Sequence, residues 1–140
     1  PLRRALSMNP KLSRAHAAIG DALLNLGDVE GALEAYALEP AKEMRLTGLA
    51  IALARAKRDS EATKARAELV AIGDRALYQH AQVQAEAREV DAAIASLERA
   101  RALHDGGMIY TRNDPFLDPL RDDARFNLLL DRLGFDSPAA

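Results

Sequence analysis

The stretch GDVEGALEAY, residues 27–36, decides the expected fold. After its Gly-Asp turn, apolar side chains fall on one side of a helix at Val29, Ala32, Leu33 and Tyr36. The middle of this face is an alanine, and a residue that small allows another backbone to approach closely. The stretch therefore predicts a helix that packs tightly against a neighbour at Ala32.

The same spacing of small residues occurs three times along the chain. Twelve residues separate the two members of each pair, which are Gly20 and Ala32, Ala50 and Ala62, and Ala81 and Ala93. A polar turn lies between the members, with the sequences LGD, AKRD and ARE. Each unit is predicted to be two antiparallel helices that cross at the small residues. Because one such hairpin cannot bury its own apolar face, several are expected to stack.

These units resemble the tetratricopeptide repeat family. The residues that carry the resemblance are HAAIGDALLNLGDVEGALEAY (16–36) and REVDAAIASLERA (88–100), and RRALSMNP (3–10) is similar to the end of a preceding repeat. The resemblance implies an all-α fold, a superhelix of antiparallel helix hairpins with a C-terminal capping helix. The middle unit departs from the pattern, because Ala32 and Ala62 are 30 residues apart, where the family period is about 34. Arg66 and Gln84 are polar in positions that are usually apolar.

The expected organisation has four parts. Residues 1–12 end a preceding repeat, 13–103 form about three hairpins, 104–122 form a loop with short turns, and 123–140 form a capping helix and tail. The predicted helices cover 2–8, 13–26, 29–38, 41–57, 59–72, 75–87, 90–103 and about 123–133. Aspartates stand near several helix starts, where a carboxylate can cap free N–H groups: Asp28, Asp59, Asp74 and Asp91.

The C-terminal sequence DPFLDPLRDDARFNLLLDRLGF, residues 114–135, is a different kind of pattern. It resembles the ends of repeat arrays in bacterial multidomain signalling proteins, where the repeats follow a winged-helix domain, a nucleotide cyclase or a Ser/Thr kinase. The resemblance implies the accessory end of a larger regulatory protein. A cap is also expected on physical grounds, since the last repeat of an array exposes an apolar face.

Composition narrows the possible functions. The 140 residues are 49% hydrophobic but 4% aromatic, and the net charge of −2 provides no basic excess for nucleic acid. No apolar run approaches the roughly 20 residues that a membrane-spanning helix needs. The absence of cysteine excludes disulfides and thiolate metal sites. We expect a cytoplasmic protein, although a periplasmic one stays open.

No catalytic constellation is recognisable in the sequence. His16, His80 and His104 are far apart along the chain. The aspartates of the tail do not have the spacing of a calcium loop, and the serines stand in no nucleophile motif. We therefore expect no enzymatic activity, no cofactor and no metal.

The candidate site follows from the resemblance, which implies that the first helix of each hairpin lines a concave groove. By position, the groove residues are Arg14, Asp21, Asn25, Thr47, Ile51, Arg55, Tyr78, Gln79, Gln82 and Glu86. Tyr78 is expected to be the main anchor, since an exposed aromatic side chain binds a peptide with little loss of entropy. Asn25, Gln79 and Gln82 would supply hydrogen bonds, and Arg14 and Arg55 would face acidic groups.

The expected function is non-catalytic binding of a protein, as an extended peptide or a partner helix, in this groove. The alternative is a spacer or self-association element that brings effector domains together, with the N-terminal half-repeat around Leu2, Ala5, Leu6 and Met8 binding a second copy. A third hypothesis is small-molecule sensing around Tyr110, Phe116 and Phe126.

Overall fold

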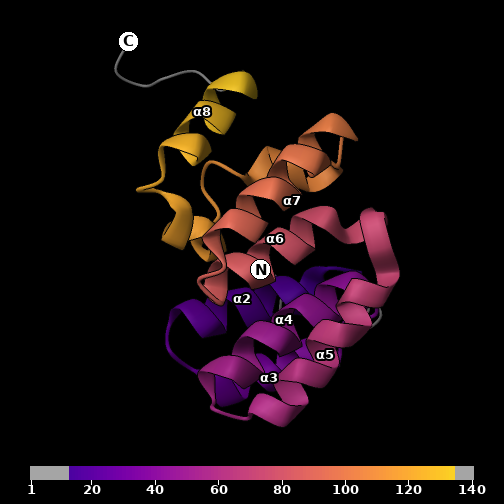
Figure 1. Cartoon of the computed structure of the whole chain (residues 1–140). Coiled ribbons are helices and arrows are strands. Elements are labelled where there is room, and N and C mark those ends of the chain that lie inside the picture. Colours follow the sequence, from indigo (N-terminus) through magenta and orange to yellow (C-terminus); the bar gives the residue numbers. More distant parts are fainter. Residues whose placement is uncertain (1–12, 135–140) are drawn as a thin grey trace. The chain divides into compact units, whose positions relative to one another are not determined.

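A computed structural model describes residues 13–134, and within this range the secondary structure is helical, without strands (Figure 1). The α-helices are α2 (Ala15–Asn25), α3 (Val29–Ala37), α4 (Lys42–Arg55), α5 (Asp59–Ile72), α6 (Leu77–Glu86), α7 (Val90–Ala102) and α8 (Ala124–Arg132). The short 3₁₀ helices are η1 (Gly73–Ala76), η2 (Gly106–Tyr110) and η3 (Pro115–Leu120). The all-α prediction is confirmed, and these α-helices begin and end within two residues of the predicted positions. The predicted helix 2–8, and with it the N-terminal half-repeat, lies outside the described residues.

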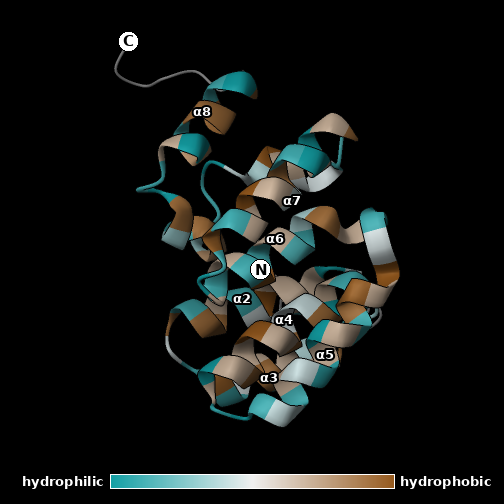
Figure 2. Ribbon diagram, in the orientation of Figure 1, coloured by the Kyte–Doolittle hydropathy of each residue, from teal (hydrophilic) through white to brown (hydrophobic). Residues whose placement is uncertain are grey.

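The chain divides into two compact units between Ile72 and Gly73. Unit 1 contains α2 to α5, and unit 2 contains η1 to α8. Hydrophobic and hydrophilic residues alternate along the helices of each unit, as amphipathic helices require (Figure 2). Unit 2 has its own cluster of buried apolar side chains.

Unit 1 consists of two helix hairpins built around one tyrosine. α2 pairs with α3, α4 pairs with α5, and α3 also packs on α4. The ring of Tyr36 is fully buried and lies against two glycines, Gly20 of α2 and Gly48 of α4. A Cβ atom on Gly20 would stand 2.5 Å from this ring, and one on Gly48 would also overlap it. The small residues of this unit thus make room for an aromatic side chain as well as for a backbone.

Four helices end in the same kind of turn. The residue after each C-cap has a left-handed backbone, and these residues are Gly27, Lys57, Arg88 and His104. In each turn the next N–H group bonds back to a carbonyl five residues earlier, for example from Asp28 to Leu23 at 2.9 Å. This pattern satisfies carbonyl groups that would otherwise lack a partner at the helix end. Only one of the four positions is glycine, the residue that adopts this conformation without strain.

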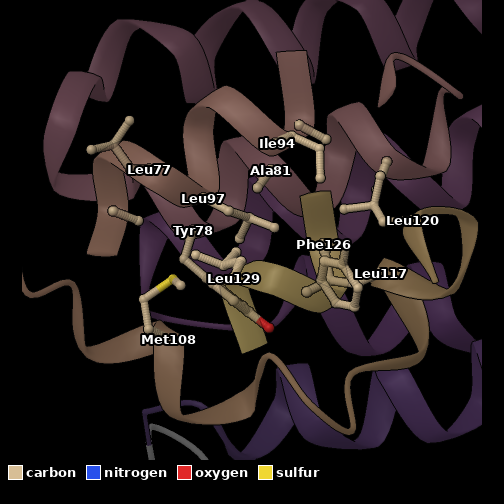
Figure 3. Packing of buried hydrophobic residues seen from close by; sticks show 13 residues of the cluster. Leu77, Tyr78, Ala81, Ile94, Leu97, Met108, Leu117, Leu120, Phe126 and Leu129 are labelled. Carbon is tan, nitrogen blue, oxygen red and sulfur yellow. The ribbon is translucent and has the colours of Figure 1, made fainter. Parts of the chain in front are cut away.

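Unit 2 is one helix hairpin, α6 and α7, covered by the segment that follows it. η3 contacts α6, and α8 contacts α7. Side chains from all of these elements form one cluster (Figure 3), which includes Leu77, Tyr78, Ala81, Ile94, Leu97, Met108, Leu117, Leu120, Phe126 and Leu129. The C-terminal segment therefore supplies part of the core of this unit.

A polar contact also joins α6 to α7. The side-chain amide of Gln84 lies 2.7 Å from the hydroxyl of Ser96. This hydrogen bond explains how a glutamine is accommodated in a position where the repeat pattern usually has an apolar residue.

The predicted aspartate caps have mixed outcomes. The carboxylate of Asp28 caps α3 by accepting from the Gly31 N–H at 2.9 Å, as expected. Asp59 and Asp91 instead lie inside the first turns of α5 and α7. Asp74 lies within η1, where its carboxylate pairs with Arg99 across 2.5 Å. This ion pair raises the pKa of the Arg99 guanidinium, chiefly through the hydrogen bond to Asp74.

Candidate functional site

Three of the predicted groove residues are exposed, and all three belong to unit 1. Arg14 precedes α2, Asn25 is the last residue of α2, and Arg55 is the last residue of α4. The exposure of their side chains is what contact with a partner requires. Their role in binding stays a prediction.

Three other predicted residues of unit 1 are buried or half-buried. Asp21 is half-buried and accepts a hydrogen bond from the Tyr36 hydroxyl, with the two oxygens 2.6 Å apart. The side chain of Thr47 is 4% exposed, and its hydroxyl donates to the carbonyl of Glu43 in the preceding turn. Ile51 is 2% exposed. The expectation that Thr47 and Ile51 lie on an open face is wrong, because both side chains are buried.

The expected exposure of Tyr78 is also wrong. Its side chain is 2% exposed, and its ring packs against Gly107, where a Cβ atom would stand 2.6 Å from the ring. The Tyr78 hydroxyl donates to the carboxylate of Asp114, with the two oxygens 2.5 Å apart. Burial, together with the negative charge of Asp114, raises the pKa of this phenol well above its usual value. Tyr78 is thus held within the core of unit 2.

Asp114 is the residue that connects η3 to α6. Its carboxylate is 8% exposed and accepts three hydrogen bonds: from the Tyr78 hydroxyl, from the Gln82 amide at 2.8 Å and from the Phe116 N–H at 2.9 Å. The last of these is the helix cap expected for a residue before proline. The bonds from α6 link residues more than thirty positions apart in sequence.

The start of α6 is held by a second aspartate of the C-terminal segment. The carboxylate of Asp105 accepts from the Tyr78 N–H at 3.2 Å and from the Gly107 N–H at 2.8 Å. Both the backbone and the hydroxyl of Tyr78 are therefore bound by the chain's own aspartates. The face of α6 on which the sequence placed a partner is occupied, at Tyr78 and Gln82, by the chain itself.

The remaining predicted residues of α6 are less accessible than expected. Gln79 is buried, and Glu86 is half-buried. Of the four residues predicted on this helix, none has the open exposure of Arg14 or Arg55.

Sequence reasoning missed Glu39, which is 1% exposed. Its carboxylate accepts from the N–H groups of Arg14 at 2.9 Å, Ala17 at 3.0 Å and Ala41 at 2.7 Å. The free donors at the start of α2 are thus satisfied by a residue from the end of the same hairpin, and that role is structural. In the sequence, the pair Glu39-Pro40 directly before α4 was the one signal of a special role for Glu39. It could not identify the donors at Arg14 and Ala17, which lie more than twenty residues earlier.

The residues proposed for small-molecule sensing do not share one environment. Phe116 and Phe126 are buried, whereas Tyr110 is 57% exposed. Phe126 packs in the cluster of unit 2 with side chains of the C-terminal segment itself. Filling of this kind counts against a ligand cavity at Phe126.

The histidines lie in separate surroundings. His16 is buried in α2, and His104 is exposed after α7. His80 Nε2 lies 3.0 Å from the Gly73 carbonyl oxygen, and because that oxygen can only accept, this nitrogen carries the hydrogen. Among residues 13–134, no group of three or more His, Asp or Glu side chains is placed to hold a metal ion.

None of the helices in the described range is both long and apolar enough to cross a membrane. No protein-family model, curated protein or solved structure matches this chain.

Proposed function

We propose that this chain is a non-catalytic protein-interaction module of a larger bacterial regulatory protein, with tetratricopeptide-type hairpins that form a superhelix. The observation that carries the proposal is the packing of unit 1, where two consecutive hairpins associate through α3 and α4 around the buried ring of Tyr36. Stacked hairpins with small residues beside the contact are the arrangement that the repeat resemblance implies. Arrays of this kind present extended surfaces to peptides and helices.

The binding surface of the proposal lies on the first helices of unit 1. Arg14, Asn25 and Arg55 are its exposed members, and two of the three are cationic. The partner is therefore an extended peptide or helix that carries acidic side chains. On α6, Tyr78 and Gln82 already bind Asp114, so we assign no partner contact to them.

Selection from a library of displayed random peptides tests this function. The full chain serves as bait, and the recovered peptides are expected to be rich in Asp and Glu. Their affinity should fall at least about tenfold for the variant Arg55→Glu, because the substitution sets like charges against each other. Lys64→Glu is the control, since Lys64 is also an exposed cation but lies on the second helix of its hairpin, α5, and this variant should bind normally. Equal losses in both variants, or no recovered peptides, would contradict the proposal.

Self-association is the second candidate function. The observation that favours it is a set of large apolar side chains of unit 1 that are exposed: Leu26, Leu38 and Val70. In that case Arg55→Glu would leave self-association unchanged, and light scattering would show a molecular mass that rises with protein concentration. Replacement of the three apolar residues by serine would then abolish the rise.

A further inference from the structure

We draw no further inference here: the strongest candidate, the exposed apolar side chains of Leu103 at the end of α7 and of Ile109 and Tyr110 in the 3₁₀ helix η2, is an apolar surface, and nothing among the described residues shows what covers it.

Discussion

Two tyrosines have parallel roles in the two units. Tyr36 and Tyr78 are both buried, both rings lie against glycine, and both hydroxyls donate to an aspartate. The partners differ in burial, since Asp21 is half-buried and Asp114 is buried. Removal of each hydroxyl should therefore have different consequences.

We expect Tyr78→Phe to cost more free energy of unfolding than Tyr36→Phe. In the first variant a buried carboxylate loses a donor that water cannot readily replace, at a cost of about 1–3 kcal/mol. In the second variant water can reach Asp21, so the cost should be about 0.5–1.5 kcal/mol. Urea unfolding followed by circular dichroism measures both values. If Tyr36→Phe lowers the free energy of unfolding more than Tyr78→Phe does, the burial of Asp114 does not determine which hydroxyl contributes more to stability.

One of the two glycines that lie against the Tyr36 ring, Gly48, gives a second test. Gly48→Ala places a Cβ atom inside the space of the ring and should destabilise the protein by about 1–3 kcal/mol, as overpacking of a core does. Gly106→Ala is the matched control, because a Cβ atom there meets nothing within 4 Å. Thermal unfolding of the two variants compares them directly. If Gly48→Ala is as stable as the control, Tyr36 does not hold α3 against α4 as described.

At the scale of elements, the helix ends carry avoidable strain. Lys57 and Arg88 adopt the left-handed conformation, with φ angles of 62° and 64°. Lys57→Gly and Arg88→Gly should each raise the free energy of unfolding by about 0.5–1 kcal/mol, since relief of the strain outweighs the added freedom of the unfolded chain. Gly27→Ala, at the equivalent position with φ 86°, should have the opposite sign. Melting temperatures measure these changes. A lower melting temperature for both Lys57→Gly and Arg88→Gly would contradict the assignment of strain to these turns.

The start of α8 should respond to acid. The pKa of Asp123 is lowered from 3.8 to about 2, mainly because its carboxylate accepts hydrogen bonds from the side chain and the N–H group of Arg125. Because the pKa of Asp123 is lower in the folded state, its carboxylate stabilises the fold above the pKa of the unfolded chain. This stabilisation is lost as the pH falls through the pKa of the folded state.

Unfolding of the wild type and of Asp123→Asn, compared across pH, measures this contribution. The difference in stability between the two proteins should be constant from about pH 8 to 5 and should disappear between about pH 4 and 2. A difference that stays constant down to pH 2 would mean that the carboxylate charge does not contribute.

The helices were predictable and much of the candidate site was not, for a physical reason. Apolar periodicity and turn residues act over a few positions, so the ends of α3, α5 and α7 follow from nearby sequence. Burial depends on what covers a helix face. Tyr78 was expected to be exposed because the repeat resemblance placed it in a groove. Asp114, which binds its hydroxyl, lies 36 residues further along the chain, where a local pattern does not reveal it. Glu39 was missed for the same reason, since the backbone donors that it binds at Arg14 and Ala17 belong to another helix.

At the scale of the whole molecule, the two units differ in how they complete their cores. Unit 1 packs one hairpin on another, whereas unit 2 packs its hairpin on η2, η3 and α8. The α6 face is thereby bound to the chain's own carboxylates, while α2 and α4 keep exposed cationic and amide groups. The proposed partner is therefore assigned to unit 1.

The most direct test of this assignment is chemical-shift mapping by NMR. The ¹⁵N-labelled full chain would be titrated with an acidic peptide recovered by the selection. We expect shifts of the amide signals of Arg14, Asn25 and Arg55 and their neighbours on α2 and α4, with no change at Tyr78 or Gln82. Shifts concentrated on α6, or shifts that depend only on protein concentration, would contradict the assignment of the binding surface to unit 1.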